Sequence, residues 1–257
     1  MTNPHPPAAW PRPYWHPSDE QAVLHFYVFG KFPPELVIPS PRYGSPGLPA
    51  GVTIERFQNA VLRKWEGYPL AGELGAILRE ETPEAFEQSR IAPEVLVVRG
   101  NLPDAQTLDY LRDTLGVLAG LLDIGGTSIV DPQTLRLFAA PDWRAQYLIK
   151  GGAPARNHVL ILHNADEEHA QRSWVRTRGM RKFGRPDISI HNVPERDVDR
   201  AGAFCEQLVE LQSLGARFDP DQPLTVDGLP AGLVAKPGGD MSDPRFNNTH
   251  VEFRWPD

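Results

Sequence analysis

The sequence predicts an α+β protein in which helices pack against a mixed or antiparallel sheet, and three observations lead to this class. Of the 257 residues, 40% are hydrophobic and 23% are charged, which is the balance of a folded globular chain. In the first half, short apolar runs rich in strand formers alternate with longer stretches of helical periodicity. In the second half strand-like runs dominate, so we expect helices packed on sheets.

Three parts are expected along the chain. Residues 1–20 form a proline-rich arm, residues 21–150 a first α/β lobe, and residues 151–257 a second, strand-rich lobe. A glycine- and proline-containing stretch at residues 150–154 marks the boundary between the lobes. Two lobes sharing one core and a single domain over residues 21–257 both fit this pattern.

The proline content of the arm and of the stretch after the first predicted strand determines the conformation that we expect there. Six prolines fall within the first 17 residues, and six more lie between Pro33 and Pro49. Because proline fixes φ and lacks an N–H, these stretches are expected to be extended or turned. The arm either lies over its own domain, with its aromatic rings as anchors, or docks on a partner; the rings are those of Trp10, Tyr14 and Trp15.

Several runs are predicted strands. Residues 22–29 (AVLHFYVF) are nearly continuous strand formers, which favours a strand covered on both faces. Residues 95–98 (VLVV) predict a second buried strand. Alternation in residues 251–255 places Val251, Phe253 and Trp255 on one face of a strand. Shorter candidates are residues 127–130, 159–162 and 188–190.

Helical spacing predicts the helices. Thr53 is expected to begin one, since apolar residues then recur at Ile54, Phe57, Val61 and Trp65. A further helical stretch holds Phe86.

Two longer helices follow. Asp104 is expected to cap a helix with a leucine stripe at positions 108, 111, 115, 118 and 122. Pro194 is expected to start another, because acidic residues follow it in the first turn. The inner stripe of that helix is Val198, Ala201, Phe204, Cys205, Leu208, Leu211 and Gly215.

Charge and motif content narrow the function classes. The net charge of −7 disfavours nucleic acid and anionic membranes as partners. The chain has neither a signal peptide nor an apolar run of about 20 residues, so a cytoplasmic location is the default expectation. It also lacks GxGxxG, a phosphate-binding loop, HExxH and GxSxG, and we expect no cofactor.

The sequence offers only weak candidates for a metal ligand or a reactive thiol. The lone cysteine, Cys205, excludes an internal disulfide, and its place on an apolar helix face predicts an inert buried thiol. Histidines and carboxylates crowd residues 158–169, but a strand there would place His158 and His163 on opposite faces. No metal site is therefore predicted.

Residues 172–185 (RSWVRTRGMRKFGR) stand out because they carry six cations and no acid. In a chain of negative net charge, this concentration predicts a binding face for carboxylates or phosphates. The alternative is that these cations pair with the protein's own acids. The candidate binding residues here are Trp174, Arg176, Thr177, Arg178, Arg181, Lys182, Arg185 and Asp187.

A second polar stretch, residues 238–252 (GGDMSDPRFNNTHVE), supplies two more candidates, Asn247 and His250. It is either a turn-rich loop held by its own Asx side chains or, if it folds beside the basic segment, one wall of a polar cleft. The sequence leaves this choice open.

Three segments resemble uncharacterised bacterial families of unknown function: GGTSIVDPQTLRLF (125–138), RTRGMRKFGRPDISI (176–190) and FNNTHVEF (246–253). The resemblance covers about residues 90–255 and is most specific at Thr177, Gly179, Gly184, Pro186 and Asp187. It implies a cytoplasmic bacterial α+β domain, and some similar proteins are suspected of belonging to toxin–immunity or secretion neighbourhoods. It implies no catalytic residue.

Two functional hypotheses follow. The first is a non-catalytic protein of immunity or adaptor type, which binds a protein partner through the basic face. The second is an enzyme or binding protein for an anionic small molecule, with Arg178, Arg181 and Arg185 holding the anion and His250 or Asp187 as acid or base. A closed pocket lined by these residues would favour the second hypothesis, and a flat basic face the first.

Overall fold

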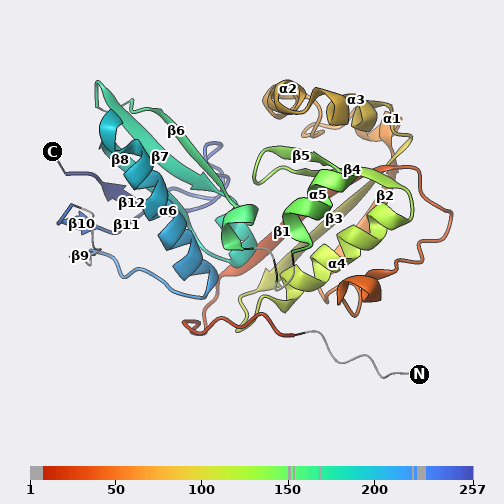
Figure 1. Ribbon diagram of the computed structural model, residues 1–257, viewed down its shortest axis with the longest axis horizontal. Helices are drawn as coiled ribbons and strands as arrows, with labels where there is room; N and C mark the ends of the chain where they lie inside the picture. The colour runs from red at the N-terminus through yellow and green to blue at the C-terminus, as the bar shows by residue number, and fades with distance from the viewer. Residues whose placement is uncertain are drawn as a thin grey trace. The chain divides into compact units, whose positions relative to one another are not determined.

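The computed structural model describes residues 8–149, 152, 154–167, 169–221, 223–224 and 230–256. The chain divides into two compact units (Figure 1). The first unit comprises the chain up to Pro11 and the stretch from Val23 to Ala153; the second comprises Arg12–Ala22 and the chain from Pro154 onward. Helices and mixed sheets in the described residues confirm the predicted α+β class.

Some predictions fall outside the described residues. They are those for residues 1–7 of the arm, for residues 150, 151 and 153 of the predicted boundary, and for residue 168 among the crowded carboxylates. No helix in the described part of the chain is long and apolar enough to cross a membrane.

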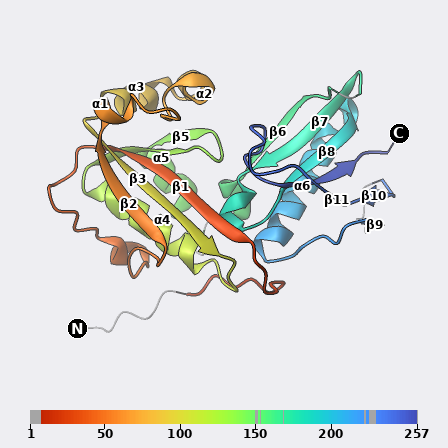
Figure 2. The same cartoon turned by 180° about the vertical axis from the view of Figure 1, so that it is seen from behind.

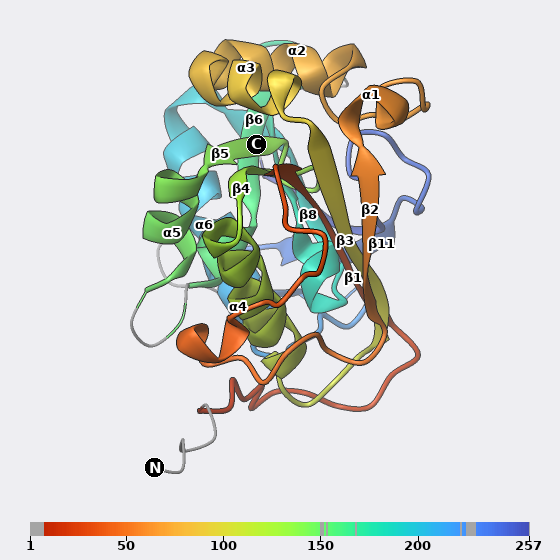
Figure 3. The same cartoon turned by 90° about the vertical axis from the view of Figure 1, so that its right-hand side faces the viewer.

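The first unit is built on a sheet with the strand order β2-β3-β1-β4-β5. Its strands are β1 (Gln21–Gly30), β2 (Val52–Gln58), β3 (Glu94–Pro103), β4 (Gly126–Asp131) and β5 (Arg136–Ala139). Its helices are η1 (Ser40–Tyr43), α1 (Asn59–Leu62), α2 (Gly72–Glu81), α3 (Pro83–Ile91), α4 (Asp109–Asp123) and α5 (Ala140–Tyr147). Helices α4 and α5 cover one face of the sheet, and α1–α3 gather at one end of it (Figures 1 and 3).

The leucine stripe of α4 is buried, as its spacing predicts. On the opposite side of this helix, the chain around η1 packs directly against the helix backbone. A Cβ atom added to Gly116 would lie 2.4 Å from the Cβ of Ser45, so only glycine permits this approach. The contact fixes Tyr43 beside α4.

Three expectations for the first unit are wrong. Residues 53–57 belong to strand β2 and not to a helix, because β2 pairs with β3 over its whole length, from Val52 to Gln58. Asp104 does not cap α4, which begins five residues later with Leu108 at the N-cap. In β1 only one face is fully buried along the strand, since Val23, His25 and Tyr27 on the other face are half-buried.

The second unit holds a sheet with the order β11-β12-β8-β7-β6 and a short β9–β10 pair. Its strands are β6 (Leu160–Ala165), β7 (Arg172–Arg178), β8 (Asp187–Pro194), β9 (Pro223–Leu224), β10 (Leu233–Val234), β11 (Lys236–Gly238) and β12 (His250–Arg254). Its helices are η2 (Ala155–His158), η3 (Met180–Phe183), η4 (Glu195–Asp197) and α6 (Val198–Ser213). Helix α6 crosses one face of the sheet (Figures 1 and 2).

The core between α6 and the sheet follows the predicted pattern. Val251, Phe253 and Trp255 are buried, which confirms the alternation in β12. The rings of Phe204 and Phe253 meet edge to face, with centroids 5.5 Å apart. Leu211 departs from the predicted stripe, because it is exposed.

The described part of the arm lies on the protein itself. In the second unit, the buried guanidinium of Arg12 donates from Nε to the Ser213 carbonyl at 3.0 Å and from Nη2 to the Phe183 carbonyl at 3.0 Å. Ser213 is the last residue of α6, where backbone carbonyls lack helical partners and a cation is favoured. In the first unit, the backbone N–H of Trp10 donates to Asp109 Oδ1 at 2.9 Å.

Candidate functional site

The two polar segments singled out from the sequence lie side by side in the second unit. Strand β8 pairs with β12 in parallel, with Asp187 opposite His250. Arg178 Nη1 donates to the carbonyl oxygens of Pro244 at 2.7 Å and Arg245 at 2.8 Å. Arg181 Nη1 donates to the Asn247 carbonyl at 3.2 Å. The arginines therefore hold the 238–252 loop onto the sheet.

Asp187 and Thr177 form a buried cluster at the start of β8. The Thr177 hydroxyl donates to Asp187 Oδ1 at 2.8 Å, and Asn248 Nδ2 donates to Asp187 Oδ2 at 2.9 Å. Burial raises the pKa of Asp187 to about 6, although these hydrogen bonds oppose the shift. Both side chains are fully buried, and their described hydrogen bonds are to the protein itself.

Lys182 and Arg185 belong to the interior and not to a binding face. Lys182 Nζ donates to the His158 carbonyl at 3.0 Å. Arg185 donates to the Gly215 carbonyl at 3.0 Å and to Glu20 Oε2 at 3.0 Å. Backbone carbonyls, and not the acidic side chains expected from the sequence, accept most of the described hydrogen bonds of these two cations.

Trp174 and Arg176 pack on each other. The Arg176 guanidinium lies 4.0 Å from the Trp174 ring centroid, and His191 stacks on the same indole with centroids 5.2 Å apart. Trp174 Nε1 donates to Ser189 Oγ at 2.8 Å. The indole is buried, so it offers no open platform for a base, whereas Arg176 stays partly exposed.

Among the predicted site residues, His250 lines a pocket in the second unit. Its ring stacks on Phe246 with centroids 4.4 Å apart, and burial lowers the pKa of the imidazole below its usual value. The ring lies against Gly238 and Gly239, where an added Cβ would approach it to 2.8 and 2.5 Å. Glycine at both positions therefore makes room for the histidine.

The pocket beside His250 has a volume of about 450 Å³, within the usual range for a small ligand. Sequence reasoning missed its other polar residues, since Glu20, Gln212 and Arg217 belong to no motif. Their proximity depends on how the arm and the chain after α6 meet. The pocket is lined by Glu20, Pro186, Gln212, Arg217, Phe218, Pro237, Gly238, Gly239, Thr249, His250 and Val251.

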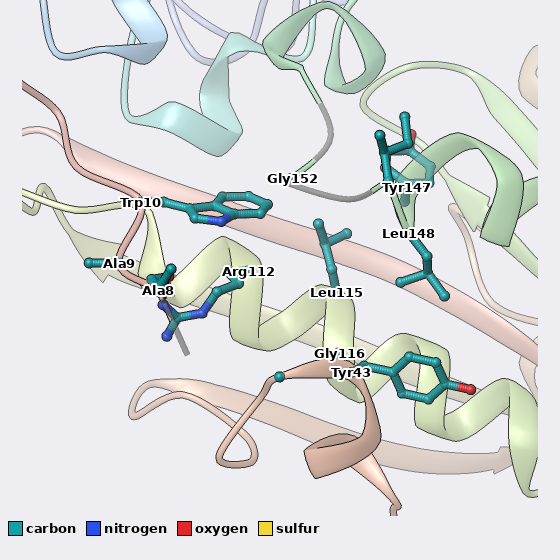
Figure 4. Close-up of a pocket in the computed structure, with 12 residues that line it drawn as sticks. Ala8, Ala9, Trp10, Tyr43, Arg112, Leu115, Gly116, Tyr147, Leu148 and Gly152 are labelled. Carbon is teal, nitrogen blue, oxygen red and sulfur yellow. Dashed lines mark hydrogen bonds between the residues drawn. The ribbon is translucent and has the colours of Figure 1, made fainter. Parts of the chain in front are cut away.

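The first unit carries a separate pocket of about 560 Å³ (Figure 4). In this view Leu115 rises from α4 between the indole of Trp10 and the side chain of Leu148, and the ring of Tyr43 lies on the η1 side of the pocket. Leu148 is 36% exposed and its neighbour Ile149 is 43% exposed. The sequence pattern pointed to Trp10 as an aromatic anchor and to Leu115 as part of a leucine stripe, but the pocket that they share depends on contacts between distant segments.

Charged groups near the pocket of the first unit are already paired with one another. Arg112 forms ion pairs with Asp109 at 2.9 Å and Asp113 at 2.8 Å. Arg144 pairs with Asp123 at 2.8 Å. In Figure 4 the Arg112 guanidinium turns away from Leu115 toward Ala8, whose carbonyl accepts a hydrogen bond from it at 2.7 Å. The described lining of the pocket is thus largely apolar, and its charged member, Arg112, is already paired.

The described residues form neither a metal site nor a reactive thiol. They contain no group of three or more His, Cys, Asp or Glu side chains placed to hold a metal ion. Cys205 is fully buried, and burial raises the pKa of its thiol, as expected for an unreactive cysteine. Asp166 is instead a hydrogen-bond acceptor, which takes the Asn192 N–H at 2.7 Å.

Comparison of the chain with known protein families, with curated proteins and with solved structures gave no match. The resemblance to bacterial families of unknown function therefore stays a prediction, and function is inferred from residues and geometry alone.

Proposed function

We propose that the protein acts by binding another protein, and that the pocket in the first unit receives an apolar side chain of that partner. One observation carries this proposal: Trp10, Leu115 and Leu148 line a recess whose charged lining residue, Arg112, is already paired. An immunity-type or adaptor role is of this kind, because such a protein acts by occupying a surface of its partner.

The composition of the pocket supports a protein partner. Energetically important centres of protein interfaces combine aromatic and apolar pockets with a polar rim that excludes water. Here the paired Arg112 and the Tyr43 and Tyr147 side chains supply the polar groups of the lining, and Leu148 and Ile149 are partly exposed. Binding would remove both side chains from water, which favours association in proportion to the apolar area buried.

The paired charges define the anchor that the pocket prefers. An anionic anchor would have to compete with Asp109 and Asp113 for Arg112, and a cationic anchor would have to compete with Arg112 for these carboxylates. A neutral aromatic or branched aliphatic side chain carries no such cost. We therefore propose a neutral, apolar anchor.

The test places a photoreactive amino acid at Ile149 in the full-length chain, within cells of the source organism. We expect it to cross-link one specific protein on illumination. The same amino acid at Ile91, which is 71% exposed in the same unit, is the matched control and should not capture that protein.

A second variant tests the pocket itself. Leu148→Glu places a charge at the edge without disturbing the core, and it should abolish the cross-link from Ile149 while the circular-dichroism spectrum stays unchanged. Capture of the same proteins from Ile149 and Ile91 alike, or an undiminished cross-link in Leu148→Glu, would show that the pocket is not the docking site.

A further inference from the structure

We propose that the pocket in the second unit binds a small organic carboxylate with an apolar body and a hydroxyl or amino group, and that Arg217 holds the carboxylate. This site is independent of the pocket in the first unit, and no lining residue is shared. The site has three features: an arginine already engaged with a carboxylate, an apolar wall, and a buried acceptor without a hydrogen-bond partner among the described residues.

Arg217 shows the preference of the site directly, because a carboxylate of the chain itself occupies it. Arg217 Nη2 donates to Glu20 Oε2 at 2.9 Å. The planar guanidinium suits carboxylates through paired N–H donors. Both side chains are more than one-third exposed, and such a surface pair is weak, so a ligand carboxylate can replace Glu20 on Arg217 at small cost.

Glu20 does not lose its charge partner in this exchange. Arg185 Nη1 donates to the same Glu20 oxygen at 3.0 Å, and the Arg185 side chain is fully buried. Arg185 is in turn fixed by the carbonyls of Gly184 and Gly215. Glu20 therefore stays neutralised when Arg217 turns to a ligand, which makes it an internal competitor for the site.

The walls determine the rest of the ligand. Phe218 lines the pocket and is held edge to face against Phe253, with centroids 6.2 Å apart. Val251, Pro186 and Pro237 add further apolar surface. A volume of about 450 Å³ accommodates a ligand the size of an aromatic amino acid, whose ring would contact these side chains.

Gln212 is the residue expected to accept a hydrogen bond from the hydroxyl or amino group of the ligand. It lies in the pocket wall, fully buried, and its Nε2 donates to the Pro186 carbonyl at 3.1 Å. Its Oε1 accepts no hydrogen bond from any described residue. Because a buried acceptor without a donor is costly, a ligand O–H or N–H that reaches this oxygen would be stabilised. The oxygen has almost no accessible surface, so the proposal requires the wall to yield as the ligand enters.

The test is isothermal titration of the full chain with four probes. Phenyllactate and phenylalanine carry the carboxylate, the ring and the donor; phenylpropanoate lacks the donor, and phenyllactate methyl ester lacks the charge. We expect phenyllactate or phenylalanine to bind most tightly, phenylpropanoate more weakly, and the ester not to bind measurably.

Two variants and one control separate the possible outcomes. Arg217→Gln should weaken phenyllactate binding by roughly ten- to a hundredfold, as for loss of a charge-assisted hydrogen bond. Glu20→Gln removes the competitor but keeps an oxygen acceptor for Arg185, and it should tighten binding. Arg196→Gln, at an arginine that is 85% exposed and outside the pocket, should leave binding unchanged.

Certain results would overturn the proposal. They are equal binding of phenyllactate and its ester, unchanged binding in Arg217→Gln, or no binding of any carboxylate even in Glu20→Gln. Circular dichroism of each variant establishes that the fold is retained, and Glu20→Gln keeps the test decisive if Arg217→Gln fails to fold.

Discussion

Asp187 is a carboxylate in the protein interior whose protonation is coupled to folding. Thr177, Asn248 and the Met180 N–H donate to it, and Arg178 is the nearby cation that favours its charge. Burial outweighs these effects and raises the pKa of Asp187 from 3.8 to about 6. The folded protein therefore keeps a proton that the unfolded chain has already released.

The free energy of unfolding should fall as pH rises from about 4 to about 6, since the folded state binds more protons over that range. The stabilisation is complete below the unfolded pKa and is lost above the folded one. Its size is on the order of 3 kcal/mol. Asp187→Asn cannot ionise and should lack this component. Urea unfolding of both proteins at several pH values measures it, and parallel pH profiles would contradict it.

Helix α6 and the arm depend on one glycine after the helix. Gly215 adopts φ of +102°, and a Cβ atom there would lie 2.5 Å from the Trp15 nitrogen. The Tyr14 N–H donates to the Leu214 carbonyl at 3.0 Å, so the arm runs directly over this turn. Gly202, in the middle of α6, has nothing within 4 Å of an added Cβ.

Alanine at these two glycines should act in opposite directions. Gly202→Ala should raise the free energy of unfolding by about 0.5–1 kcal/mol, because it lowers the backbone entropy of the unfolded chain without a clash. Gly215→Ala should lower it by roughly 1–3 kcal/mol through backbone strain and displacement of the arm. Thermal unfolding followed by circular dichroism compares the variants; a shift of both midpoints in the same direction would refute this account.

At the scale of the whole molecule, the two candidate binding pockets lie one in each unit, and they differ in chemistry. That of the first unit has an apolar centre with paired charges, and that of the second has Arg217 and a buried acceptor. Substitutions that share no contacts usually have additive effects. The two binding activities should therefore be separable.

Leu148→Glu should abolish partner capture and leave phenyllactate affinity unchanged. Arg217→Gln should weaken phenyllactate binding and leave partner capture unchanged. The double variant should show the sum of the single effects. Cross-linking and titration on the same four proteins measure this. A change of phenyllactate affinity of more than about threefold in Leu148→Glu would instead indicate coupling between the units.

The sequence by itself determined the class of fold and the elements whose residues repeat regularly. The leucine stripe of α4 and the alternation in β12 were predicted because the side-chain period follows from backbone geometry alone. The buried strand at residues 95–98 was also predicted, since its apolar run needs cover on both faces.

The tertiary structure decided what periodicity leaves open. Pairing with β3 made residues 53–57 a strand, although their spacing also fits a helix. The fold turned Lys182 and Arg185 inward, because it offered them backbone carbonyls that no sequence pattern reveals. It also brought Glu20 to Arg217 and Trp10 to Leu115, across separations too large for local rules. Both pockets are products of these long-range contacts, which only the folded chain brings together.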